Sequence, residues 1–153
     1  MSVEHSTLTG SDLHEPKGVA SASTGQVYIA NGSGSGTWTA HHNKCVLTVQ
    51  LANISVASSC YIATPIAGTI SKIYSVISAA ITGGDAIITS KLGSTALTNG
   101  AITIANGSAI AAEDNCTPTA NNTVTVGQAI TLTSDGGSTN TSIGTFTIEI
   151  TPS

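Results

Sequence analysis

The sequence predicts an all-β protein, an antiparallel two-sheet sandwich preceded by an extended N-terminal arm. Valine, isoleucine and threonine, which favour strands, supply 50 of the 153 residues. The 16 glycines are typical of a chain with many tight turns. No helical apolar pattern is long enough for a crossover helix, so we expect mainly antiparallel pairing. The jelly roll is the commonest such arrangement of about eight strands.

The chain is expected to divide near residue 43. Residues 1–43 hold all four histidines and show no sustained alternation of apolar and polar residues. Within them, only Gln26–Ala30 is expected to form a short strand. The run of glycine and serine at residues 31–36 has the composition of a flexible linker. We therefore interpret residues 1–43 as an extended arm with a linker, and residues 44–153 as the sandwich domain.

Period-two patterning predicts the strands of the domain in order. Turn signals separate them: Gly83-Gly84 before one strand, and Asn99-Gly100 as the strongest hairpin signal. A loop is expected over residues 106–121. The eight or nine expected strands cover residues 45–51, 60–64, 69–78, 85–92, 94–97, 101–104, 123–126, 128–133 and 145–150.

Alternation also predicts which side chains share a face of a strand. Ile73, Ser75 and Ile77 share one face of their strand, and Phe146, Ile148 and Ile150 share one face of the last strand. The core should consist of isoleucine, valine, leucine and alanine rather than aromatic rings. The outer faces are rich in threonine and serine, and burying hydroxyls costs less than burying unpaired charge. Such faces are suited to packing against copies of the chain or a partner.

Charge and compartment signals exclude several classes. A net charge of −4 without arginine argues against nucleic-acid binding, which needs a basic surface. No apolar run is long enough for a membrane span, and we expect no secretory signal at the N-terminus. Cys45, Cys60 and Cys116 have no metal-binding spacing, so we expect free, buried thiols. A disulfide between two of them is the alternative.

Residues for catalysis are scarce. The histidines lie in the arm, and no Ser or Cys has a recognisable base and acid near it in a known motif. Glu113 and Asp114 are adjacent, so on an extended segment their carboxylates point apart. His41 and His42 lack the spacing of a metal site. The glycine run at residues 32–36 lacks the Lys-Ser/Thr of a phosphate-binding loop. We predict no enzyme, no cofactor and no metal.

The arm contains the most specific motifs, Leu13-His-Glu-Pro-Lys-Gly18 and the Ala-Asn-Gly-Ser-Gly-Ser-Gly-Thr-Trp run at residues 30–38. They resemble an N-terminal segment of tailed-bacteriophage virion proteins described as head decoration, head fibre or tail fibre proteins. Residues 66–78 and 145–150 are similar in general composition and pattern to small phage β-sandwich proteins on the capsid surface. The resemblance covers nearly the whole chain, but in the sandwich part it rests on this general pattern more than on a specific motif.

The resemblance implies a non-enzymatic, oligomeric virion protein. We expect a capsid decoration protein, a homotrimer on the head surface whose arm contacts the major capsid protein. The alternative is a head or tail fibre whose sandwich binds host glycans through exposed aromatic residues or the loop at residues 106–121. Pro16 favours an extended arm. The segment at residues 13–18 could instead be a turn on the chain's own sandwich. The expected contact residues are Leu8, Leu13, His14, Glu15, Pro16, Lys17, Tyr28 and Trp38.

Overall fold

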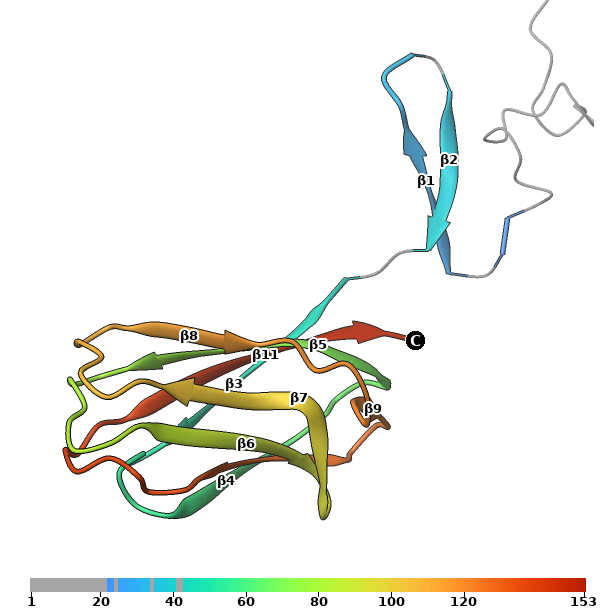
Figure 1. The fold of residues 1–153 in the computed structure, drawn as a ribbon. Coiled ribbons are helices and arrows are strands. Elements are labelled where there is room, and N and C mark those ends of the chain that lie inside the picture. The colour runs from blue at the N-terminus through green and yellow to red at the C-terminus, as the bar shows by residue number, and fades with distance from the viewer. Residues whose placement is uncertain (1–21, 24, 34, 41–42) are drawn as a thin grey trace, which may run out of the picture. The chain divides into compact units, whose positions relative to one another are not determined.

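The computed structural model describes residues 22–23, 25–33, 35–40 and 43–153. The chain divides into two compact units, Met1–His42 and Asn43–Ser153 (Figure 1). The described residues form strands, turns and loops, and none of them forms a helix. The predicted all-β class is therefore confirmed for the part of the chain that can be described.

The first unit contains a β-hairpin of two short strands, β1 (Gln26–Ala30) and β2 (Gly36–Ala40), which pair antiparallel. β1 matches the expected strand, whereas β2 was not expected. The interpretation of residues 31–36 as a linker is wrong where they are described, because these residues form the hairpin turn and the first residue of β2. Composition misled here because glycine and serine suit tight turns as well as linkers.

The second unit, all of whose residues are described, contains nine strands, which agrees with the eight or nine expected. Most lie within two residues of the predicted bounds, and β3 matches them at both ends. The strands are β3 (Cys45–Leu51), β4 (Ser58–Ala63), β5 (Gly68–Ile77), β6 (Ala86–Leu92), β7 (Thr95–Ile104), β8 (Glu113–Cys116), β9 (Thr123–Val124), β10 (Ala129–Ser134) and β11 (Gly144–Pro152).

These strands form two sheets that lie one over the other (Figure 1). One sheet has the order β3-β11-β5-β8, with β9 also pairing with β5; the other has the order β4-β10-β6-β7. Every strand pair is antiparallel, as expected. The edge strands β3 and β4 contact each other on one side of the sandwich, and β7 and β8 do so on the other.

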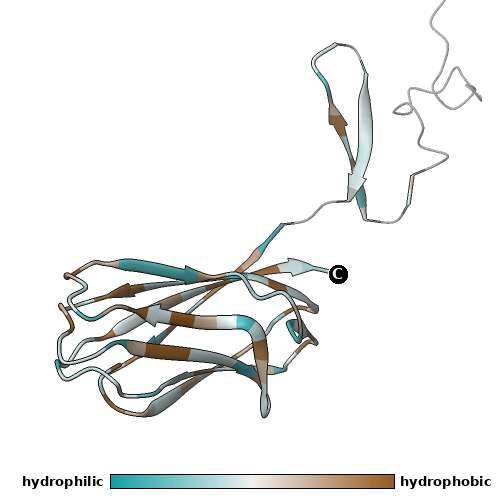
Figure 2. Cartoon of the chain, viewed as in Figure 1, coloured by the Kyte–Doolittle hydropathy of each residue, from teal (hydrophilic) through white to brown (hydrophobic). Residues whose placement is uncertain are grey.

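The core lies between the two sheets and is built mainly from isoleucine. Ile73, Ser75 and Ile77, which were expected to share one face, are all buried, and so are Phe146 and Ile148. The buried Phe146 ring corrects the expectation of a core without aromatic rings. Figure 2 shows the resulting change between apolar and polar residues along the strands. Burying each such isoleucine contributes roughly 1.5–3 kcal/mol, so the sheets are held together chiefly by these contacts. The fully buried large side chains are Phe146, Ile54, Ile70, Ile73, Ile77, Ile81, Ile88, Ile102, Ile104, Ile130, Leu132 and Ile148.

The strongest hairpin signal, Asn99-Gly100, is not a hairpin turn. Both residues lie inside β7, and the turn between β6 and β7 falls at Gly93 and Ser94. The β6–β7 pairing shifts between Thr89 and Lys91, so the Asn99 region is a bulge, and Asn99 has a φ of 56°. Positive φ serves both tight turns and bulges, which is why the dipeptide alone could not decide between them.

Two other local predictions are also corrected. Gly83-Gly84 does not connect paired strands, because β5 and β6 belong to different sheets. A side chain at Gly84 would collide with the carbonyl oxygen of Gly137, so glycine allows two loops to approach closely. The expected loop at residues 106–121 contains β8, and its acidic residues Glu113 and Asp114 pair with β5.

Candidate functional site

Six of the eight predicted contact residues lie outside the described residues, as do the four histidines. These six are Leu8, Leu13, His14, Glu15, Pro16 and Lys17. The structure therefore places only Tyr28 and Trp38, which lie on the two strands of the hairpin.

Tyr28 and Trp38 form a cross-strand aromatic pair. They are register partners in β1 and β2, their ring centroids lie 5.4 Å apart, and the ring planes are tilted by 59°. Both residues are half-buried. Such tilted pairs contribute roughly 0.5–1.5 kcal/mol. These two residues, which were predicted to contact the capsid or another subunit, thus contact each other and stabilise the hairpin.

The hairpin turn is stabilised by Asn31. Its side-chain Oδ1 accepts hydrogen bonds from the backbone N–H groups of Ser33 and Ser35, at 2.9 Å and 3.2 Å. The Asn31 backbone N–H donates to the Ser35 carbonyl at 2.8 Å. Gly36 must be glycine, because a Cβ would collide with the backbone carbonyl of Ile29. These contacts order a segment whose composition indicated flexibility.

The hairpin has no core of its own. The described side chains of β1 and β2 are half-buried or exposed, and Val27 and Ile29 are 36% and 53% exposed. An isolated two-stranded hairpin is marginally stable in water. Its apolar residues therefore gain stability when another surface covers them, which is the behaviour expected of a contact element.

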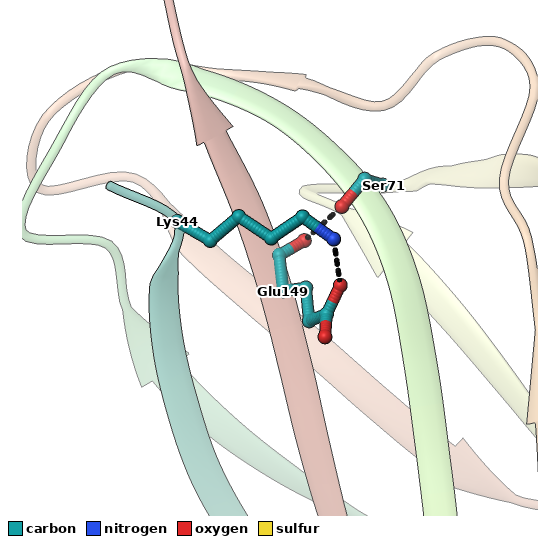
Figure 3. Close-up of polar contacts among 3 residues, drawn as sticks. All are labelled: Lys44, Ser71 and Glu149. Atoms are coloured by element: carbon teal, nitrogen blue, oxygen red, sulfur yellow. Dashed lines mark hydrogen bonds and ion pairs between the residues drawn. The ribbon is translucent and has the colours of Figure 1, made fainter. Parts of the chain in front are cut away.

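A polar cluster lies where the sandwich domain begins. Lys44, directly before β3, donates from Nζ to Glu149 Oε2 on β11 at 2.5 Å, as Figure 3 shows. The hydrogen bond to Glu149, followed by its negative charge, raises the pKa of Lys44 above the ordinary lysine value. Ser71 Oγ donates to the backbone oxygen of Glu149 at 3.3 Å. The β5–β11 register shifts at this place: Glu149 pairs with Lys72, whereas the next residue, Ile150, pairs with Ile70.

A second lysine lies beside this cluster. Lys72 is the register partner of Glu149, and its Nζ lies 4.8 Å from the centroid of the Tyr74 ring. This is cation–π geometry, worth about 0.5–1 kcal/mol at an exposed site. Lys72 is thus the cross-strand neighbour of the residue whose carboxylate pairs with Lys44. Sequence reasoning missed this cluster, because Glu149 lies more than 70 residues from either lysine in the sequence.

A pocket of about 440 Å³ opens between the end of β3 and the start of β4. Val56 and Cys60 are among its lining residues, and burial raises the pKa of the Cys60 thiol, so a reactive thiolate is disfavoured. The other lining residues are Gln50, Leu51, Ala52, Asn53, Ser58 and Ser59. None of them carries a charge, so the pocket offers packing and hydroxyl or amide hydrogen bonds.

Three further observations concern the described part of the chain. No group of three or more His, Cys, Asp or Glu side chains within it could hold a metal ion. No helix there is long and apolar enough to cross a membrane. Cys45, Cys60 and Cys116 are free thiols, as expected, but only Cys116 is buried; Cys45 and Cys60 are half-buried.

Comparison with other proteins does not add a family or function to these features. No protein-family model, no curated protein and no solved structure matches the chain.

Proposed function

We propose that this chain is a capsid decoration protein of a tailed bacteriophage, a homotrimer that binds the outer surface of the assembled head. The proposal starts from the resemblance of residues 13–18 and 30–38 to the N-terminal segments of phage virion proteins. One structural observation carries it further. Among the described residues, the buried core cluster is drawn entirely from residues 51–150.

The division of the chain into two units suits a protein with one folded body and one contact element. The hairpin keeps Val27 and Ile29 exposed and has no core. In the proposed function, the segment containing Leu13, Pro16 and Lys17 lies on the major capsid protein, and the hairpin carrying Tyr28 and Trp38 packs beside it. Extended segments and exposed strands commonly bind partners by adding strands or filling grooves.

The strand order supports a finer description of the sandwich, as a jelly roll. The orders β3-β11-β5-β8 and β4-β10-β6-β7 are compatible with two interlocked Greek keys, because each sheet takes strands from both ends of the domain. Jelly rolls recur among viral capsid and lectin domains. This support is a fold-level analogy and does not by itself assign a function.

The mechanism is thermodynamic linkage. A protein that binds the assembled shell but not its loose subunits stabilises the shell by its binding free energy. At a free concentration of about 100 times Kd, this amounts to about 2.7 kcal/mol per site. Three arms on one trimer raise the effective concentration of each further contact, so a modest affinity for each arm is sufficient.

The test compares full-length protein with a variant lacking residues 1–18, on phage heads assembled without the protein. We expect the deletion to abolish binding to the heads while the circular dichroism spectrum and melting of the sandwich stay unchanged. A Trp38→Ala variant should bind with reduced affinity. Decoration at full occupancy by the deletion variant would show that the arm is not the anchor.

The same proteins distinguish the fibre alternative. The decoration role predicts binding to heads and no specific binding to a panel of bacterial surface glycans. Glycan binding that persists without residues 1–18, together with no binding to heads, would favour a fibre with a glycan-binding sandwich.

A further inference from the structure

The two adjacent edge strands β3 and β4 belong to a segment without charge. No Asp, Glu, Lys or Arg occurs from Cys45 to Ser71, and both strands lie within this range. Lys44, directly before it, is neutralised by Glu149. Natural edge strands are usually protected against pairing with another chain by charge, proline, bulges or short length. β3 and β4, of seven and six residues, contain neither charge nor proline.

The opposite side of the sandwich has these protections. β8 has only four residues and carries Glu113 and Asp114, and most of it is coloured hydrophilic in Figure 2. β7 is interrupted by its bulge and is bridged within it: the Thr98 N–H donates to Ala120 at 3.0 Å, and the Thr119 N–H donates to Thr98 at 2.9 Å. The β8 edge is thus protected by short length and charge, and β7 by its bulge and this bridge, whereas β3 and β4 have none of these features.

The apolar interior is also less well covered on the β3/β4 side. Leu47 and Val49 of β3 and Ile62 of β4 face the core but are only half-buried. On the opposite side, Ile102 of β7 and Cys116 of β8 are buried. The 440 Å³ pocket opens at the same side, and the exposed residues Val46, Val56 and Tyr61, at 57%, 54% and 68%, belong to the same uncharged segment.

We propose that the β3/β4 edge, comprising Cys45–Leu51 and Ser58–Ala63, is the docking surface for a second copy of this chain. The positions of the acidic residues favour a second copy of the chain as the partner on this edge. In the sandwich, the acidic residues other than the neutralised Glu149 are Asp85, Glu113, Asp114 and Asp135, none of which lies on this edge. Copies of an acidic chain repel each other least where neither presents a carboxylate.

The inference rests on the self-association included in the proposed function but does not depend on capsid binding. In the proposed trimer, the β3/β4 edge of each copy lies at the contact with a neighbouring copy. The half-buried side chains become buried there, and the unpaired backbone groups of the edge strands gain partners or are shielded from water. The pocket between β3 and β4 accepts a side chain from the neighbouring copy.

The experiment uses full-length protein and places lysines on the edge. Val46→Lys with Tyr61→Lys alters two exposed side chains, and Ile110→Lys is the matched control, because Ile110 is also 68% exposed but lies outside the edge. Light scattering over a dilution series should show a wild-type oligomer. The edge variant should raise the dissociation constant about 100-fold, since like charges are brought together in the assembly. The control should leave it within about threefold.

Hydrogen exchange provides an independent measurement. Peptides covering β3 and β4 should be protected in the wild-type oligomer and should exchange rapidly in the edge variant, whereas peptides covering β8 should not change. A monomeric wild-type protein, or an edge variant that remains assembled, would overturn the inference. An oligomer dissociated by the edge lysines but unable to bind heads would support this interface while contradicting the decoration role.

Discussion

Lys44 and Glu149 connect the two ends of the sandwich domain: Lys44 Nζ lies 2.5 Å from Glu149 Oε2. Lys44 directly precedes the first strand of the domain, and Glu149 lies on β11, which is the last strand and the neighbour of β3. The pair fixes the start of β3 against the centre of its sheet, next in sequence to the boundary between the two units.

Glu149→Gln should lower the melting temperature slightly in low salt. The lysine is largely exposed, so the pair is screened by water and ions, and the difference from wild type should shrink in high salt. The Ser71 hydrogen bond is retained, because it uses the backbone oxygen of Glu149. Thermal melts at two salt concentrations measure the effect. A difference independent of salt would mean that packing, rather than charge, explains the change.

The same pair has a defined pH dependence. Glu149 raises the pKa of Lys44 above its ordinary value of 10.5, so the pair's contribution is complete below pH 10.5. The contribution is lost as the pH rises through the folded-state pKa. Wild-type and Glu149→Gln proteins should therefore converge in stability in strong alkali.

Ser90→Ala should stabilise the protein or leave its stability unchanged. The Ser90 hydroxyl is buried between the sheets, and no hydrogen-bond partner lies near it among the described residues. Burying an unpaired hydroxyl costs roughly 1–3 kcal/mol, part of which the substitution recovers. Chemical denaturation measures the change.

Ser134→Ala is the matched control for Ser90. Ser134 is also buried on an inner face, but its hydroxyl donates to the Ile54 carbonyl at 2.5 Å and accepts from the Gly136 N–H at 3.2 Å. Its removal should destabilise the protein by about 1–3 kcal/mol, because buried partners lose their hydrogen bonds. Equal effects at the two serines would contradict this assignment of their environments.

Gly100→Ala should destabilise the protein by about 1–3 kcal/mol, because the added methyl group collides with the Cβ of Leu97 inside the bulge of β7. Gly93→Ala, in the β6–β7 turn, should destabilise the protein by only about 1 kcal/mol, and for a different reason. Gly93 has a φ of 58°, and nothing lies within 4 Å of its added Cβ. Denaturation of both variants tests the bulge: an equal or smaller loss at Gly100 would argue against the crowded bulge.

The Cys116 thiol should make the folded protein less stable in alkali. Burial raises the pKa of its thiol from 9.0 to about 11. Between these values the unfolded chain loses the proton while the folded chain keeps it, so the unfolded state binds fewer protons and stability falls as pH rises. Cys116→Ala should show a shallower fall over this range in denaturation curves. Parallel curves for the two proteins would show that the Cys116 thiol does not contribute.

Much of the sandwich could be predicted because alternation records burial directly. The side chains expected to share one face of β5 and of β11 do so and are buried, including Ser75 and Phe146, since each buried face leaves a period of two in the sequence. β8 was missed because Glu113 and Asp114 are polar, although a short edge strand can be polar and still pair. β2 was missed because its glycine and its neighbours suggested a linker.

The candidate site was harder to predict than the fold. Of the eight expected contact residues, the structure describes two, and their aromatic contact depends on the register of the hairpin. The asymmetry between the β3/β4 and β7/β8 edges could not be inferred from local patterns, because it depends on which strands end up at the edges.

The sequence by itself determined the all-β class, the division near residue 43 and the buried faces of the long strands, because these follow from local composition and alternation. Only the tertiary structure decided that Asn99-Gly100 is a bulge, that Lys44 meets Glu149, and that the uncharged strands β3 and β4 are neighbouring edges. The physical reason is that pairing between strands distant in the sequence depends on the packing of the whole core, which no local pattern records.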